Sequence, residues 1–444
     1  MLKKERRISA RVSSLFLFNI MVERSGKMSE QNNNIAILVG IVQKSSELKE
    51  CENSLDELER LADTAGAKTY AKVIQVKESY DPRTLIGSGK VEEIANLAKT
   101  SDANLVVFDE ELSPAQIRNL ELDIGNEVTV LDRSMLILDI FALHATSGEG
   151  KLQVELAQLK YTAPRLIGKG LELSRQGGGI GSRGPGESKL ETDRRHLHEK
   201  VVALEARLKE LENTKSVMRA QRDRSGLSKI ALVGYTNTGK STLLNLLTGA
   251  DVLSEDKLFA TLDPTTRKTV LPSGEQILLT DTVGFIRKLP HHLIKAFKST
   301  LDEVRYADIL LIVSDISDPE ANEHLAVAKG VIEELGGGDK PVIYVYNKAD
   351  AGMDFLPSAN TADSVIVSAK TGFGIDILLE KIDYVIRQSK RRLKLLIPYT
   401  AQSLASTLYD EYAVKSTEYT EGGIMFEVVV DERGAGIFKK YIIE

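Results

Sequence analysis

One short stretch constrains the fold more than any other part of the sequence. Residues 229–242 read KIALVGYTNTGKST, an apolar run followed by a loop and the start of a helix. Gly234, Gly239, Lys240 and Ser241 match the pattern G-x-x-x-x-G-K-[ST] in the strand–loop–helix context that the pattern requires. Backbone N–H groups of such a loop bind phosphate. The stretch therefore predicts a phosphate-binding loop at the end of a buried strand.

Length and composition set broad bounds on the remainder. The chain has 444 residues, too many for one ordinary core, and we expect two to four domains. A net charge of −6 argues against extensive wrapping by nucleic acid but leaves room for a local basic patch. The single cysteine, Cys51, fits a reducing compartment. A cytoplasmic location is expected, with partial membrane association left open.

The first residues are interpreted as an extension, disordered or non-native. The apolar run SSLFLFNIM, residues 13–21, is shorter than the ~20 residues that span a bilayer, so no stable membrane insertion is expected. It follows KKERR, which leaves a targeting segment open, although no clear cleavage site follows. Whether residues 1–27 are made in the cell also stays open.

The hydrophobic pattern predicts a multidomain α/β protein. Strand and helix patterns alternate in the region of the phosphate loop, which predicts a parallel-rich sheet with helices on both faces. The expected segments are an extension at 1–34, an N-terminal α/β domain at 35–150, a helical hairpin with a Gly/Arg-rich loop at 151–226, the P-loop domain at 227–390, and a small C-terminal α/β domain at 391–444.

The N-terminal domain contains a second glycine-lysine pair. Residues 87–93 read GSGKVEE, but Thr84 and Val91 stand where a full phosphate loop needs glycine and Ser or Thr. We interpret this stretch as a turn that caps a helix.

The hairpin segment has two features of interest. Its second helix carries apolar residues on a heptad-like seam, namely Leu197, Val201, Leu204, Leu208, Leu211 and Met218. The preceding loop and the helix start gather Arg175, Arg183, Lys189, Arg194 and Arg195. Arginines among glycines can approach a phosphate backbone, so we favour RNA contact at residues 176–195 over a flexible linker and a solvated helix face.

Two elements are predicted to hold the phosphates and a magnesium ion. Lys240 would bridge the β- and γ-phosphates, and the Ser241 hydroxyl would bind Mg²⁺. The stretch LLTDTVG, residues 278–284, ends a strand at Asp281, which would hold Mg²⁺ through a water. The backbone N–H of Gly284 can reach the γ-phosphate because no side chain obstructs it.

Two further elements predict selection of guanine. The stretch VIYVYNKAD ends a strand at Asn347, Lys348, Ala349 and Asp350. A carboxylate such as Asp350 accepts from both the N1–H and the exocyclic amine of guanine, a pattern that adenine lacks. The stretch VIVSAK supplies Ser368, Ala369 and Lys370, whose backbone can meet guanine O6.

Two positions around the phosphates are less determined. A switch loop should offer a threonine to Mg²⁺ when the γ-phosphate is present, and spacing alone leaves Thr261, Thr265 and Thr266 as candidates. Many GTPases place a water-holding glutamine immediately after the glycine of the DTVG element. Phe285 stands there, and a phenyl ring cannot orient a water by hydrogen bonding.

Several motifs together resemble the HflX-type GTPases, in the Obg–HflX branch of the translation-factor-related GTPases. They are DPRTLIGSGKVEEI, GGGIGSRGPGESKLETDRR, GYTNTGKST, DKLFATLDPTTR and DTVGFIRKLP. The resemblance implies that Thr261, in FATLD, is the switch threonine, a Mg²⁺ ligand beside Ser241 and a catalytic residue beside Lys240 and Gly284. Relatives usually have alanine at the position of Thr238. The remaining nucleotide-binding candidates are Tyr235, Thr236, Asn237, Phe259, Ala260, Leu262, Asp263, Thr282 and Val283.

The resemblance also implies a function. It implies a monomeric, Mg²⁺-dependent GTPase that is slow alone, binds the large ribosomal subunit and its RNA, and splits or rescues ribosomes. One alternative is an RNA-remodelling nucleotidase with a separate ATP-binding N-terminal domain. Another is a regulatory GTPase that acts away from the ribosome.

Overall fold

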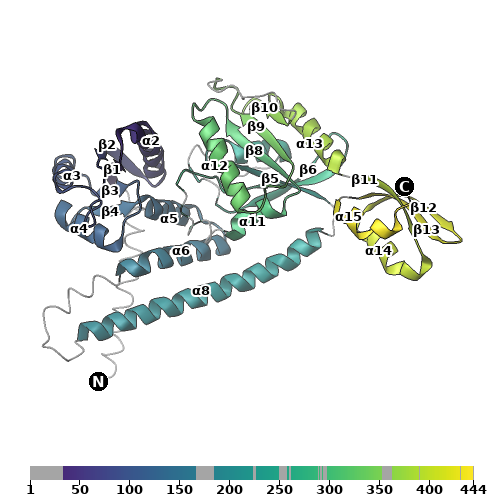
Figure 1. Cartoon of the computed structure of the whole chain (residues 1–444), viewed down its shortest axis with the longest axis horizontal. Coiled ribbons are helices and arrows are strands. Elements are labelled where there is room, and N and C mark those ends of the chain that lie inside the picture. The colour runs from purple at the N-terminus through teal and green to yellow at the C-terminus, as the bar shows by residue number, and fades with distance from the viewer. Residues whose placement is uncertain are drawn as a thin grey trace. The chain divides into compact units, whose positions relative to one another are not determined.

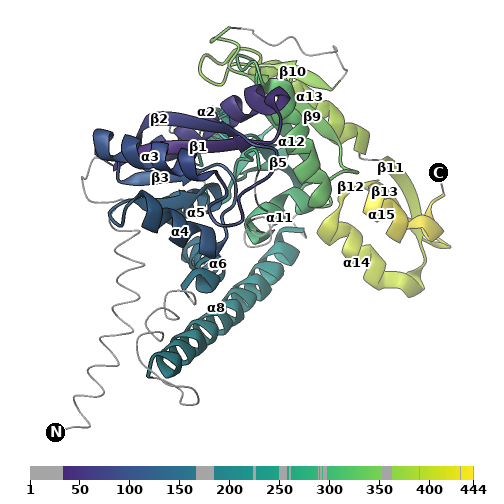
Figure 2. The ribbon, with the colours of Figure 1, turned by 60° about the vertical axis from the view of Figure 1, so that its left-hand side comes forward.

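The chain forms two compact units in a computed structural model (Figures 1 and 2). The structure describes residues 34–166, 185–223, 227–249, 258–259, 262–288, 290, 293, 298–352, 363–389, 391–430 and 432–443. The first unit comprises Met1–Leu208, Asp256–Leu262 and Arg287–Phe297. The second comprises Lys209–Glu255, Asp263–Ile286 and Lys298–Glu444. No helix in the described ranges is long and apolar enough to cross a membrane.

The first unit is built on a parallel four-stranded sheet in the order β2-β1-β3-β4. Its strands are β1 (Asn34–Val42), β2 (Ala67–Val76), β3 (Leu105–Phe108) and β4 (Thr129–Asp132). The connecting helices are α2 (Leu48–Thr64), α3 (Ser88–Ser101) and α4 (Pro114–Ile124), and α5 (Arg133–His144) follows β4. Helices α2 and α5 pack together, as do α3 and α4, so the central strands are buried on both sides and almost wholly apolar, as in β1.

Local sequence signals set the helix starts in this unit. Gly87 is the N-cap of α3, as the sequence predicts, but Ser88–Glu93 already belong to the helix and do not form a separate turn. Ser113 caps α4 by accepting from Gln116 N, and Pro114 takes the first helical position. Asp132 caps α5 by accepting from Met135 N at 2.9 Å.

A buried charged cluster lies after the ends of β3 and β4. Arg133 is 2% exposed, donates to Asp109 at 2.6 Å and pairs with Glu57. Asp109 also accepts from Ser54 at 2.8 Å and from Lys288, which belongs to the same unit, at 2.5 Å. Burial alone would raise the pKa of Asp109, but the Arg133 and Lys288 charges outweigh it and hold that pKa below its usual value.

The long helices α6 (Gly148–Leu166) and α8 (Pro185–Asp223) carry the first part of the seam that the sequence predicts, and the side chain of Met218 lies outside the described residues. Leu156, Leu159 and Leu204 form its buried centre, with Leu197, Val201 and Leu208 packed against it. Ion pairs join Lys160 to Glu205 at 2.7 Å and Lys200 to Glu155 at 2.6 Å.

The basic residues that we predict to contact RNA are described only in part. Arg194 and Arg195 are exposed. Arg175 and Arg183 lie outside the described residues, as does the side chain of Lys189.

The second unit contains a six-stranded sheet in the order β10-β9-β8-β5-β7-β6, parallel except for β6. Its strands are β5 (Ser228–Gly234), β6 (Thr265–Val270), β7 (Gln276–Asp281), β8 (Ile309–Asp315), β9 (Val342–Asn347) and β10 (Ser364–Ile366). Helices α9 (Lys240–Thr248) and α13 (Ile375–Ser389) pack on one face through an apolar core. Helices α11 (Lys298–Tyr306) and α12 (Ala321–Glu334) cover the other (Figure 1). This arrangement confirms the predicted fold class.

A small antiparallel sheet ends the second unit, with strands in the order β11-β13-β12. They are β11 (Arg391–Ile397), β12 (Ala413–Thr420) and β13 (Gly423–Val430), and helices α14 (Gln402–Glu411) and α15 (Glu432–Ile437) pack on them. The pattern of β11, α14 and β13 is readable in the sequence. The edge strand β12 is not, since its residues AVKSTEYT are mostly polar.

Candidate functional site

The loop after β5 requires its two motif glycines. Gly234 has φ +148°, and a Cβ there would stand 2.2 Å from the carbonyl oxygen of Val313 on β8. Gly239 has φ +86°, and its Cβ would stand 2.3 Å from Asn347 Nδ2. Any larger residue would push the loop off its neighbouring strands. The loop then enters α9, which begins at Lys240, so the predicted phosphate loop does lie between a strand end and a helix N-terminus, where anion binding is expected.

Lys240 is buried inside this loop. Its ammonium donates to the carbonyl oxygens of Tyr235 at 2.6 Å and Gly234 at 3.2 Å. Burial lowers the pKa of Lys240 to about 8, and the charge of Asp281 acts in the opposite direction. An incoming polyphosphate would therefore meet a cation that the loop already holds in place.

The DTVG element, Asp281–Gly284, is attached to the loop by backbone hydrogen bonds. Thr236 N donates to Phe285 O at 2.8 Å, and Phe285 N donates to Gly234 O at 3.0 Å. A Cβ on Gly284 would stand 2.7 Å from Thr236 Cα and 3.0 Å from Lys240 Nζ. Only glycine fits this position, which brings its backbone beside the lysine ammonium. The Phe285 ring itself is 1% exposed.

The guanine-selecting candidates converge through Asn347. Its Nδ2 donates to Thr238 O at 2.8 Å, and its Oδ1 accepts from Ala369 N at 2.9 Å. Asp350 accepts from the Ser368 hydroxyl at 2.6 Å, and this bond lowers the pKa of Asp350. The carboxylate is therefore ionised at neutral pH, as recognition of the guanine N1–H and amine requires.

A lysine in each of the two base loops lies close to a carboxylate. Lys348, which has φ +66°, pairs with Asp315 at the end of β8 at 2.7 Å. Lys370 Nζ lies 3.9 Å from Asp350. The structure thus brings together the phosphate loop, the DTVG element and both base loops at the carboxyl edge of one sheet, which is where ligands of open α/β sheets bind.

Three family descriptions match successive parts of the chain. They are "GTP-binding GTPase N-terminal" at residues 52–142, "GTP-binding GTPase Middle Region" at 144–222 and "50S ribosome-binding GTPase" at 229–348. A GTPase HflX from Caldanaerobacter subterraneus subsp. tengcongensis is 48% identical over 395 residues, or 89% of this chain and 90% of the relative. The chain belongs to the HflX family of GTPases.

Two further proteins are similar to this chain. The GTPase HflX of Lacrimispora saccharolytica is 49% identical over 89% of this chain and 93% of its own. A GTP-binding protein from Sulfolobus solfataricus, solved in complex with GDP, is 26% identical, with a TM-score of 0.43, and is matched over 80% of this chain and 99% of its own.

The switch segment of this HflX chain is described in part. Phe259 is 2% exposed and packs edge-to-face on Phe141 of α5 within the first unit, with ring centroids 4.7 Å apart. Leu262 is also buried, and Asp263 is partly exposed. Ala260 and the switch candidate Thr261 lie outside the described residues. Thr265 and Thr266 lie in β6, where Thr266 shares a hydrogen bond with Thr280 at 2.9 Å.

A magnesium ion fits the donors that are described. The Ser241 hydroxyl donates to Asp281 Oδ2 at 2.5 Å, so a hydroxyl and a fully buried carboxylate stand side by side at the start of α9. Oxygen donors of this kind suit Mg²⁺, which usually takes one or two protein ligands and completes its shell with phosphate and water.

The other predicted residues of the phosphate loop and the DTVG element stabilise the local structure. Thr238 Oγ1 donates to Tyr235 O at 3.1 Å, which satisfies its buried hydroxyl. Thr282 Oγ1 donates to Leu232 O at 2.7 Å. Val283 is buried and Asn237 has φ +58°, so both contribute to the shape of the site.

One neighbour of the loop is missing from the sequence-based candidates. The His324 ring stacks on Tyr235 with centroids 3.7 Å apart, and His324 Nδ1 lies 3.2 Å from Asp318. A single histidine on a helix gives no pattern in a sequence. In the loop sequence, only the aromatic Tyr235 indicates that another ring would pack against it.

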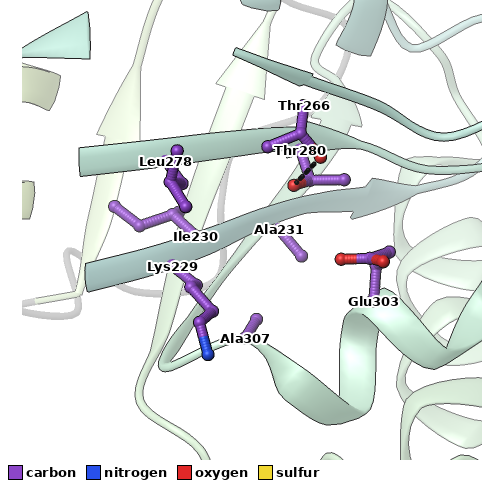
Figure 3. Close-up of a pocket in the computed structure, with 8 residues that line it drawn as sticks. All are labelled: Lys229, Ile230, Ala231, Thr266, Leu278, Thr280, Glu303 and Ala307. Atoms are coloured by element: carbon purple, nitrogen blue, oxygen red, sulfur yellow. Dashed lines mark hydrogen bonds between the residues drawn. The ribbon is translucent and has the colours of Figure 1, made fainter. Parts of the chain in front are cut away.

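A small cavity in the same domain is not the nucleotide site. It has a volume of about 20 Å³ and is lined by Lys229–Ala231, Thr266, Leu278, Thr280, Glu303 and Ala307 (Figure 3). These residues include the amino-terminal half of β5, whereas the phosphate loop follows the carboxyl end of that strand. The space suits a single water molecule.

Proposed function

We propose that this HflX-family chain is a Mg²⁺-dependent GTPase that hydrolyses GTP slowly alone and is stimulated by the large ribosomal subunit. It would serve as a GTP-controlled factor that splits or rescues ribosomes in the cytoplasm. The observation that carries the GTPase part is the Asn347 side chain, which joins the phosphate loop to the base-recognition loop. A ligand with both a guanine and a phosphate chain matches this pair of linked subsites.

The phosphate subsite supports hydrolysis by positioning and charge neutralisation. Lys240 would contact the β- and γ-phosphates, and the Gly284 N–H would meet the γ-phosphate. Ser241 and, through a water, Asp281 would hold Mg²⁺, with Thr261 as the further ligand from the switch segment. A bound Mg²⁺ neutralises charge on the phosphates. The close approach of Gly284 to Lys240 supports these roles because it brings both groups to one point.

Slow hydrolysis follows from the residue after Gly284. Phe285 offers no hydrogen bond to a water, and its ring is buried. A partner that orders the switches would raise the rate. Support for the ribosome as this partner comes from the family, from the matched description "50S ribosome-binding GTPase", and from the exposed Arg194 and Arg195 on α8. These arginines adjoin the loop that we predict to contact RNA.

The deciding experiment measures steady-state GTP hydrolysis by the purified chain, with and without isolated large ribosomal subunits. At least tenfold stimulation is expected, with both rates abolished in Lys240→Ala. Unchanged rates with subunits would refute the ribosomal part and leave the GTPase assignment intact. Deletion of Gln176–Glu187 is expected to weaken subunit binding without altering the rate of the free chain. ATP hydrolysis that survives in Lys240→Ala would instead support a separate nucleotide site in the N-terminal domain.

A further inference from the structure

Thr236 carries the one hydroxyl of the phosphate loop that nothing in the described structure explains. Thr236 is only 5% exposed, and its Oγ1 has no hydrogen-bond partner among the described residues. Its loop neighbour Thr238 is satisfied by the Tyr235 carbonyl. A buried hydroxyl without a partner is destabilising, so such a group in a native fold calls for an explanation, such as a catalytic role or a bound water or ion.

The position of Thr236 is fixed by the surrounding backbone. Its N–H donates to Phe285 O at 2.8 Å, and the reciprocal bond runs from Phe285 N to Gly234 O at 3.0 Å. Thr236 Cγ2 lies 2.8 Å from the point where a Cβ on Gly284 would stand, and Lys240 Nζ lies 3.0 Å from that same point. The Thr236 side chain and the lysine ammonium therefore both pack closely against Gly284, whose N–H is proposed to meet the terminal phosphate.

The hydroxyl can take the place of the methyl that faces Gly284. Oγ1 and Cγ2 branch from the same Cβ, so rotation about the single χ1 bond exchanges their positions between staggered wells. A threonine hydroxyl both donates and accepts, which is what a water-orienting group must do. The residue expected to do this, at position 285, is a phenylalanine with its ring buried.

We infer that the Thr236 hydroxyl is a catalytic residue that hydrogen-bonds the water attacking the terminal phosphate of GTP. The inference rests on the proposed GTPase function and assigns the group that takes the place of the missing glutamine. In the step, the water oxygen bonds to the terminal phosphorus. The bond from that phosphorus to the bridging oxygen breaks, and its electron pair leaves on GDP. The water's proton passes to the phosphate product, and the Thr236 hydroxyl is neither ionised nor consumed.

The test compares Thr236→Val, which keeps the branched shape, with Thr236→Ser, which keeps the hydroxyl. Single-turnover GTP hydrolysis by the free chain is expected to fall about 10- to 100-fold in Thr236→Val, at or below the lower end of the range found for loss of one orienting group, and less than about threefold in Thr236→Ser. The affinities of both variants for GDP should stay within about threefold of the parent, because GDP lacks the terminal phosphate that the water attacks.

A second readout separates catalysis from structure. The nucleotide-free Thr236→Val variant is expected to melt at the same temperature as the parent or higher, because a methyl replaces a buried hydroxyl without a partner. A lower melting temperature together with weaker GDP binding would show a structural role and overturn the inference. An unchanged single-turnover rate in Thr236→Val would overturn the inference and leave the proposed function intact. A parent chain without Lys240-dependent hydrolysis would overturn the proposed function as well.

Discussion

The side-chain amide of Asn347 donates to the carbonyl oxygen of Thr238 at 2.8 Å and so attaches the end of β9 to the phosphate loop. The same side chain accepts from Ala369 N. Both bonds are buried. One residue therefore sets the distance between the base loops and the phosphate loop before any nucleotide arrives.

Replacing this residue should weaken both subsites together. Asn347→Ala leaves the Thr238 carbonyl and the Ala369 N–H buried without partners, at a cost of about 1–3 kcal/mol each. We expect a lower melting temperature for the nucleotide-free chain and at least a tenfold loss of GDP affinity. Thermal denaturation and fluorescent-nucleotide titration measure the two effects. Loss of affinity with an unchanged melting temperature would contradict a bracing role.

Asp350 should decide between guanine and other bases. Asp350→Asn replaces an acceptor of two hydrogen bonds by an amide that donates toward the guanine amine, so GTP affinity should fall about 10- to 100-fold. Xanthosine triphosphate carries an acceptor in place of that amine and should bind the variant better than the parent. Competition binding with the two nucleotides tests this reversal. An unaltered preference for GTP in the variant would show that another residue reads the base.

Arg133 should be among the most sensitive positions in the first unit. Arg133→Met removes the partner of Asp109 and Glu57 and leaves buried carboxylates short of compensating charge. Breaking a buried pair in this way costs roughly 3–5 kcal/mol. Denaturant unfolding followed by circular dichroism measures the loss. Combining Arg133→Met with Asp109→Asn and Glu57→Gln should recover part of the lost stability. An equal loss with and without these two neutralising substitutions would exclude the charge explanation.

Asp139 should make the first unit less stable as pH rises. Burial raises the pKa of Asp139 on α5 to about 7, although Gln158 donates to its Oδ1 at 3.3 Å. The folded state then holds a proton that the unfolded chain releases near pH 4, so stability falls between about pH 4 and pH 7 and levels off above. Asp139→Asn stays neutral throughout and should remove this slope, with a gain on the order of 4 kcal/mol at pH 8. Melting temperatures at several pH values give the slopes.

Much of the site is predictable because its physics is local. Gly234, Gly239 and Gly284 are needed where a Cβ would strike a neighbouring atom, and each lies in a short motif that is contiguous in sequence, the phosphate loop or the DTVG element. The helix seam at Leu197, Val201 and Leu204 is equally readable, because apolar spacing repeats along one segment.

Other features depend on residues far apart in the chain. Arg133 meets Asp109 and Glu57 across 24 and 76 positions, and the single-residue signal at each is an ordinary charge. His324 meets Tyr235 in the same way, without a motif. Strand β12 is missed because an exposed edge strand needs no regular alternation of apolar residues.

The buried ring of Phe285 has a consequence for protein engineering. Its N–H and C=O both hydrogen-bond to the phosphate loop, and its side chain is buried. Installing glutamine at this position would therefore not recreate the catalytic group of other GTPases. It would bury an amide that has to find new hydrogen bonds or force the loop apart. A faster enzyme is more readily sought by redesigning the phosphate loop that faces Phe285, where Thr236 already supplies a hydroxyl.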